Sequence, residues 1–125
     1  MVTLIEQPHS ICEGVAYLVD SSVLAETFEN LDYREKNGYS RHEVTLHTND
    51  NSEATLDGVV YIAVPGNFAY LGEAPLPIIA KQIRDSVGPS GKNSEYLLNL
   101  AAALRKLECH DEHVFQLESC LKEIM

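Results

Sequence analysis

The spacing of hydrophobic and polar positions changes about midway along the chain. In the first half, residues 14–19 (GVAYLV) and 59–64 (VVYIAV) are short continuous apolar runs, which are typical of strands covered on both faces. Residues 41–48 alternate instead, as in a half-buried strand, and residues 49–54 (NDNSEA) are a predicted polar turn. One face of the alternating strand carries His42, Val44, Leu46 and Thr48.

A short amphipathic helix is predicted between the strand at residues 14–19 and the strand at residues 41–48. Ser21 and Ser22 precede the sequence VLAETFENL at residues 23–31. A serine at this place typically caps a helix, because its hydroxyl accepts a hydrogen bond from a free backbone N–H. The triplet Arg34-Glu35-Lys36 then lies where the helix passes into the following strand.

After Pro75 the apolar positions recur every three or four residues, which predicts helices. The chain contains three such stripes: Leu76, Ile79, Ile83 and Val87; Leu97, Leu100, Ala101, Leu104 and Leu107; and Val114, Leu117, Leu121 and Ile124. Strands followed by helices indicate the α+β class.

Composition and charge narrow the class of protein. The chain has 125 residues, of which 45% are hydrophobic, and this predicts a single globular domain spanning residues 1–125. The formal net charge is −10 at pH 7, which argues against nucleic-acid binding and against a membrane-surface protein, because both require a cationic face. No apolar run approaches the length of a membrane span, and the start of the chain lacks a secretory pattern.

The cysteines bear on the compartment of the protein. Cys12, Cys109 and Cys120 are widely spaced and odd in number, which favours reduced thiols over a disulfide framework. We therefore expect a cytosolic protein.

Residues 87–96 (VGPSGKNSEY) imitate a phosphate-binding loop. The spacing differs, because Gly88 and Gly91 enclose two residues where a P-loop has four, and Asn93 follows the lysine where a P-loop has Ser or Thr. The stretch instead predicts a tight turn before a helix that Asn93 or Ser94 caps.

Residues 109–115 (CHDEHVF) imitate a metal site. Cys109, His110, Asp111 and His113 lie close together in the sequence, but a tetrahedral zinc site usually draws its ligands as two well-spaced pairs, and the sequence contains no second pair. We expect instead that Asp111 caps the last helix and that the histidines are partly exposed.

The placement of Glu35 between two cations has two interpretations. A charged triplet before Asn37-Gly38 is often a solvated turn. The alternative is a carboxylate with a chemical role. Composition and spacing leave both open.

Five segments together resemble the ChaC family of glutathione-specific γ-glutamylcyclotransferases, in order and with similar intervals. They are GVAYLV, LDYREKNGY, YIAVPGNFAYLGEAP, IAKQIRDSVGPSGKNSEYLLNLAAALRKL and DEHVFQLE. The resemblance implies a mixed β-barrel of the γ-glutamylcyclotransferase type with flanking helices. It also implies a cytosolic lyase that needs no metal or organic cofactor and cleaves glutathione to 5-oxoproline and Cys-Gly.

The resemblance implies that Glu35 is the catalytic acid/base, because the glutamate of the family's Arg-Glu-Lys triplet maps onto it. The α-amine of the substrate must lose a proton before it attacks the γ-carbonyl, and the departing nitrogen must gain one. Arg34 or Lys36 nearby would favour the ionised carboxylate, whereas burial would oppose it. Tyr39 and Tyr70 occupy family-like positions and are candidate substrate-binding residues, although a tyrosine in the core or at a barrel rim satisfies the same pattern.

The sequence departs from the family at its start. Family members carry a Tyr-Gly-Ser-Leu loop after their first strand, and this chain has no such segment. We therefore expect the first strands of the barrel to be missing, with an exposed sheet edge that associates with another chain. Since one lost oxyanion donor typically costs about 10²- to 10³-fold, we expect little or no turnover from the isolated chain.

Two functional classes remain open at this point. The first is a glutathione-specific γ-glutamylcyclotransferase. The second is a catalytically inactive truncated form that acts as a protein-interaction or regulatory module.

Overall fold

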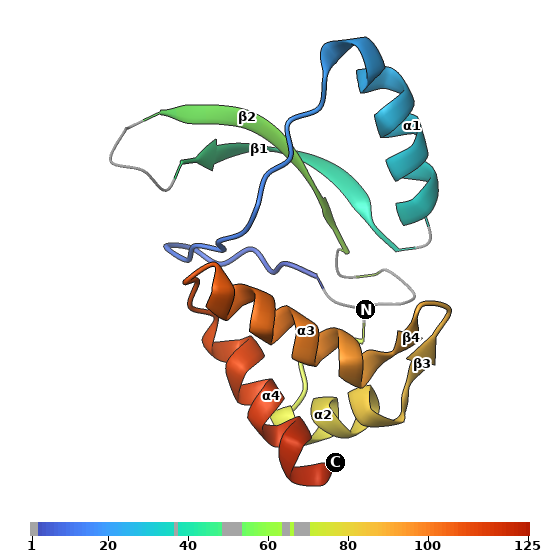
Figure 1. The fold of residues 1–125 in the computed structure, drawn as a ribbon, viewed down its shortest axis with the longest axis vertical. Coiled ribbons are helices and arrows are strands. Elements are labelled where there is room, and N and C mark those ends of the chain that lie inside the picture. Colours follow the sequence, from blue (N-terminus) through green and yellow to red (C-terminus); the bar gives the residue numbers. More distant parts are fainter. Residues whose placement is uncertain (1–2, 37, 49–53, 64–65, 67–70) are drawn as a thin grey trace. The chain divides into compact units, whose positions relative to one another are not determined.

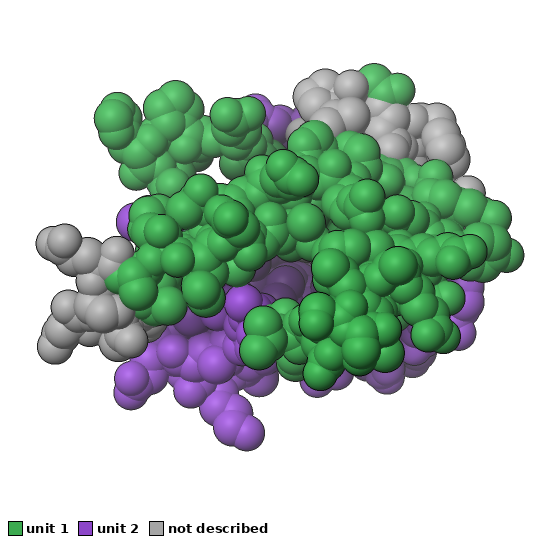
Figure 2. All heavy atoms as spheres, turned by 90° about the horizontal axis from the view of Figure 1, so that it is seen from above, with its two compact units in different colours: residues 1–10, 17–72 green, residues 11–16, 73–125 purple. Residues whose placement is uncertain are grey.

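The computed structural model describes residues 3–36, 38–48, 54–63, 66 and 71–125 (Figure 1). The chain divides into two compact units, which Figure 2 shows in different colours. Unit 1 comprises Met1–Ser10 and Tyr17–Gly72, and unit 2 comprises Ile11–Ala16 and Glu73–Met125. That residues 1–125 form one domain stays a prediction.

The regular structure of unit 1 begins with a turn of 3-10 helix, η1 (Ser21–Val23), which leads into α1 (Leu24–Glu35). The predicted serine cap is wrong. The carboxylate of Asp20 accepts a hydrogen bond from the N–H of Ser22 at 2.9 Å. Asp20 has extended backbone angles and a short side-chain acceptor, so it meets the requirement of a cap one residue before the serines.

β1 (Ser40–His47) and β2 (Thr55–Ile62) form an antiparallel pair in which Ser40 lies opposite Ile62 and His47 opposite Thr55. The predicted alternation is confirmed, because one face of residues 41–48 is half-buried and the other exposed. β2 begins earlier than predicted. Its predicted last residue, Val64, lies outside the described residues, as does most of the predicted turn at residues 49–54.

The apolar run at residues 14–19 does not form the predicted strand. Val15, Tyr17 and Leu18 are 57%, 87% and 100% exposed. A continuous apolar run becomes a buried strand only where neighbouring strands supply hydrogen bonds and cover both of its faces. In the described part of the chain, β1 and β2 pair with each other and with no third strand.

Unit 2 contains the three predicted helices, α2 (Leu76–Asp85), α3 (Asn93–Lys106) and α4 (Glu112–Ile124). Val87 and Leu107 differ from the predicted stripes, because they lie past the ends of α2 and α3 and are 71% and 44% exposed. The apolar faces of the helices meet in a core that consists of Ala80, Leu97, Ala101, Val114, Leu117 and Leu121.

A short antiparallel pair, β3 (Val87–Gly88) and β4 (Gly91–Lys92), connects α2 to α3. Gly91 has a φ angle of 122°, a conformation open mainly to glycine, so the predicted tight turn is confirmed. The predicted side-chain cap is wrong. Within the described residues, no side-chain hydrogen bond caps α3, and the N–H of Asn93 donates to the carbonyl oxygen of Ser86 at 3.1 Å instead.

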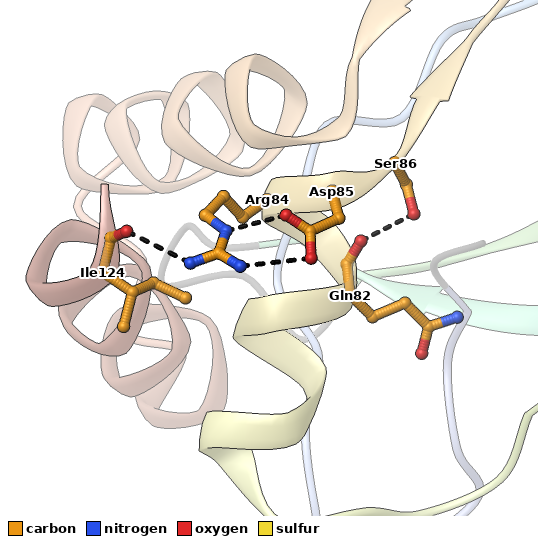
Figure 3. A network of polar contacts seen from close by, with 5 residues as sticks. All are labelled: Gln82, Arg84, Asp85, Ser86 and Ile124. Carbon is orange, nitrogen blue, oxygen red and sulfur yellow. Dashed lines mark hydrogen bonds and ion pairs between the residues drawn. The ribbon is translucent and has the colours of Figure 1, made fainter.

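Polar contacts fix the ends of α2 and α4 (Figure 3). Arg84 donates to the two carboxylate oxygens of Asp85 at 2.8 and 3.1 Å and to the carbonyl oxygen of Ile124 at 3.4 Å. The hydroxyl of Ser86 donates to the carbonyl oxygen of Gln82 at 2.6 Å. A cation at the end of α4 satisfies a free carbonyl and complements the negative end of the helix dipole.

One acidic side chain is buried in unit 2 together with cationic partners. Glu118 is 4% exposed, accepts hydrogen bonds from Arg105, and has an oxygen 2.9 Å from the ammonium of Lys122. The hydrogen bonds from Arg105 and then from Lys122 lower the pKa of Glu118 to about 2. An ionised carboxylate therefore links α3 to α4.

Helices and antiparallel strands thus occur together in the described residues. The predicted α+β class is confirmed.

Candidate active site

Glu35 is the last residue of α1, at the junction between the helix and β1. Its side chain is half-buried, whereas Arg34 and Lys36 on either side are exposed. The carbonyl oxygen of Glu35 accepts a hydrogen bond from the N–H of Tyr39 at 2.9 Å, which ties the end of the helix to the residue before β1. The predicted location of the triplet is confirmed.

Neither flanking cation forms an ion pair with Glu35 within the described residues. The ammonium of Lys36 lies 4.0 Å from the centroid of the Tyr33 ring, a cation–π contact. The influence of Arg34 or Lys36 on Glu35 stays a prediction.

The position of Glu35 does not favour the stability of its helix. The carboxyl-terminal end of a helix is the negative end of its dipole, where Lys, Arg or His is stabilising and an anion is not. A residue that breaks a local rule of this kind often has a functional role. The placement of Glu35 thus weighs against the interpretation as a structural turn residue.

Of the two candidate substrate-binding tyrosines, one lies within the described residues and the other does not. Tyr39 is half-buried and lies directly before β1, and its backbone contact places it at the same junction as Glu35. Tyr70 lies outside the described residues. The binding role of each stays a prediction.

Sequence reasoning missed a polar cluster that joins α1 to both strands. The hydroxyl of Tyr61 donates to one carboxylate oxygen of Asp32 at 2.5 Å, and a guanidinium nitrogen of Arg41 lies 3.3 Å from the other oxygen. The guanidinium carbon of Arg41 also lies 4.8 Å from the centroid of the Phe28 ring. Burial raises the pKa of Tyr61, and the hydrogen bond to Asp32 raises it further.

The segment that imitated a metal site has a structural role. The predicted cap of α4 is confirmed, because the carboxylate of Asp111 accepts a hydrogen bond from the N–H of Val114 at 3.1 Å. The ring of His110 packs edge-on against Phe115, with 5.8 Å between the ring centroids. In the described ranges, no group of three or more His, Cys, Asp and Glu side chains is placed to hold a metal ion.

Among the residues that the structure describes, none of the helices is long and apolar enough to cross a membrane.

The comparisons with known proteins point to one family. The chain matches the ChaC-like protein family over residues 1–124. It is 39% identical over 118 residues to glutathione-specific gamma-glutamylcyclotransferase 1 of Rattus norvegicus, an alignment that covers 91% of this chain and 53% of the relative. It is 40% identical over 130 residues to gamma-glutamylcyclotransferase 2-3 of Arabidopsis thaliana, which covers 99% of this chain and 65% of the relative.

The fold is also similar to a solved structure. The crystal structure of a selenomethionine-labelled γ-glutamyl cyclotransferase specific to glutathione from yeast superimposes with a TM-score of 0.75 and 29% sequence identity. The superposition covers 84% of this chain and 56% of that chain.

The chain therefore belongs to the ChaC-like protein family, and the resemblance stated from the sequence is confirmed. The structural similarity confirms an α+β fold of the γ-glutamylcyclotransferase type. The chain spans between about half and two thirds of the length of these relatives, 53% for the Rattus norvegicus protein and 65% for the Arabidopsis thaliana protein.

Proposed function

We propose that this protein is a lyase that cleaves glutathione to 5-oxoproline and Cys-Gly, with Glu35 as the acid/base. The names of the relatives from Rattus norvegicus and yeast support the substrate. The observation that carries the assignment to Glu35 is its position. A half-buried carboxylate ends α1, at a place where helix stability favours a cation, within the triplet that resembles the family's catalytic motif.

The proposed reaction is an intramolecular transfer. The α-amine nitrogen of glutathione attacks the γ-carbonyl carbon, a C–N bond forms to close the five-membered ring, and the C–N bond to the cysteinyl nitrogen breaks. Glu35 takes the proton from the α-amine and delivers it to the departing nitrogen, so no water or co-reactant is consumed. A positioned acid/base of this kind typically contributes about 10²- to 10⁴-fold to the rate.

Two tyrosines complete the proposal. Tyr39 is supported by its place at the junction that holds Glu35, from which a phenol hydroxyl would hydrogen-bond the α-carboxylate or amine of the substrate. Tyr70 rests on the sequence resemblance alone. Binding requires local hydrogen-bond donors for an anionic tripeptide, so the net charge of −10 does not oppose it.

We also propose that the protein is cytosolic and associates with another chain through a strand edge. All three cysteines are free thiols, as expected in a reducing compartment. In the described part of unit 1, β1 and β2 each have one edge without a strand partner, and such an edge can pair with a further strand. Sedimentation velocity over a range of concentrations tests this, and a monomer throughout would contradict self-association.

The release of 5-oxoproline from glutathione tests the catalytic proposal. The rate of the purified chain should be low, because the sequence contains no Tyr-Gly-Ser-Leu segment. It should fall by a further factor of about 10² to 10⁴ in Glu35→Gln, which keeps the size of the side chain but removes the acid/base group. Glu29→Gln is the matched control, because Glu29 is an exposed carboxylate on the same helix, and it should leave the rate unchanged.

Two results would contradict the proposal. Equal turnover by Glu35→Gln and Glu29→Gln would remove Glu35 from the reaction. Absence of turnover in the unmodified chain, while the Rattus norvegicus relative is active in the same assay, would contradict catalysis by this chain and support the interaction module.

A further inference from the structure

We propose that Asp32, Arg41 and Tyr61 form a clamp that holds the last turn of α1 on β1 and β2 and thereby positions the Glu35 carboxylate. The positioning claim rests on the proposed acid/base role of Glu35. The three residues act through Glu35 and are positioning residues.

The geometry of Asp32 carries the inference. Asp32 precedes Glu35 by three residues on α1, so the two side chains are neighbours on one helix face. Both carboxylate oxygens of Asp32 have a partner, the Tyr61 hydroxyl at 2.5 Å and the Arg41 guanidinium at 3.3 Å. One turn of helix therefore separates the clamped side chain from the proposed acid/base.

The two strand residues of the clamp lie side by side. Arg41 on β1 and Tyr61 on β2 are directly opposite each other in the register of the sheet. Two donors from adjacent strands thus converge on one carboxylate of the helix. A shift of α1 along or across the strands would lengthen at least one of the two contacts, so together they define its position better than one contact would.

The contact with Phe28 extends the clamp to the preceding turn. The guanidinium of Arg41 lies 4.8 Å from the centroid of the Phe28 ring, and Phe28 is four residues before Asp32 on the same side of α1. Arg41 therefore contacts two successive turns of the helix. Rotation of α1 about its axis would separate at least one of them.

Packing alone does not fix α1. The helix has no buried residue in the described structure, whereas helices are usually held by a buried apolar face. The side chains of Arg41 and Asp32 are 41% and 47% exposed, and exposed ion pairs contribute little to global stability. The clamp should therefore affect the placement of the last turn more than the stability of the fold.

Proton transfer is sensitive to such placement. An acid/base acts across a hydrogen bond of about 2.6–3.2 Å, and a displacement of about 1 Å can cost about 10²-fold in rate. Because the clamp is inferred to act on Glu35 and does not bind substrate, its loss should lower kcat and leave KM nearly unchanged.

Tyr61→Phe tests the clamp, because it removes one hydroxyl and keeps the ring. We expect kcat for 5-oxoproline release to fall about tenfold, with KM within about twofold of the unmodified chain. Tyr33→Phe is the matched control, since Tyr33 is a 69% exposed tyrosine on α1 itself, and it should change neither constant. Arg41→Lys, which keeps the charge, should retain more activity than Arg41→Met.

Amide hydrogen exchange gives a second readout that does not depend on turnover. In Tyr61→Phe, the amides of the last turn of α1 and the amide of Tyr39, which donates to Glu35, should exchange faster than in Tyr33→Phe. Unchanged exchange would overturn the clamp. Faster exchange with an unchanged kcat would overturn the positioning role and leave only a structural contact.

The two readouts separate failure of the clamp from failure of the proposed function. If Glu35→Gln is as active as the unmodified chain, or if the unmodified chain is inactive, the positioning of an acid/base is overturned with the proposed function. Exchange then still decides whether the three residues hold the end of α1.

Discussion

The two units of the protein differ in how their side chains are held. In unit 2, three helices enclose an apolar core in which Leu121 is fully buried. The buried Glu118 forms ion pairs with cationic side chains. In unit 1, α1 buries no residue and the strands are at most half-buried along their length. Yet the proposed acid/base, Glu35, lies in unit 1. The comparison teaches that burial supports one unit while directed polar contacts place the candidate chemistry in the other.

The largest expected effect is on the core of unit 2. Leu121→Ala removes a fully buried side chain and should lower the free energy of unfolding by about 2–5 kcal/mol, because it leaves a cavity as well as losing burial. Urea unfolding followed by circular dichroism measures it. The control is Ile78→Ala on α2, since Ile78 is 58% exposed. Equal losses from the two variants would break the comparison.

The second effect is electrostatic and depends on pH. Glu118→Gln should cost about 1–3 kcal/mol at neutral pH, toward the lower end because solvent screens the exposed cations. The pKa of Glu118 is about 2 in the folded protein, against an ordinary value of 4.5. The stabilisation of the fold by ionised Glu118 is therefore complete above pH 4.5 and is lost as the pH falls towards 2. The difference in urea midpoint between the unmodified chain and Glu118→Gln should shrink over this range.

A matched variant isolates the role of Glu118. Glu123→Gln changes an exposed carboxylate on the same helix and should not show this pH dependence. If the two glutamine variants behave alike, the buried ion pairs do not stabilise unit 2 as argued.

A smaller effect is expected at the start of α4. Asp111→Ala removes the acceptor for the N–H of Val114 and should cost about 1 kcal/mol. Asp111→Ser supplies another capping acceptor and should restore most of that loss. Thermal unfolding of the two variants compares them, and equal destabilisation would show that the side chain does not act as a cap.

The smallest loss of stability is predicted in unit 1. Asp32→Asn weakens a half-exposed ion pair with Arg41 and should cost about 0–1 kcal/mol. A loss as large as that of Leu121→Ala would show that polar contacts stabilise unit 1 as strongly as burial stabilises unit 2. Urea unfolding under identical conditions provides the measurement.

The sequence predicted correctly those elements that depend on the pattern of neighbouring residues. Alternation along residues 41–48 gave the correct half-buried face, and the position of Glu35 between helix and strand followed from neighbouring residues. The strand predicted at residues 14–19 was wrong. The composition of this run fits a buried strand, but in the described residues no neighbouring strand pairs with it. Val87 continued the spacing of α2, but the helix ends before it.

The polar clusters could not be predicted from the sequence, for a different reason. Asp32 and Tyr61, like Arg105 and Glu118, are far apart in the sequence, and their contacts depend on how a helix packs on a strand or on another helix. Single-residue propensities contain no such information. The Asp20 cap was missed because two serines next to it fit the same signal.

The hydrogen bond between Tyr61 and Asp32 also sets an alkaline limit for unit 1. The pKa of Tyr61 is raised above its ordinary value of 10.0 by burial and by Asp32. The stabilisation that this phenol provides is therefore present below pH 10 and lost as the pH rises through the raised pKa. Once the proton leaves, a phenolate faces a carboxylate and the contact becomes repulsive. Above this pH, the Tyr61 hydroxyl therefore no longer holds the end of α1 on β2.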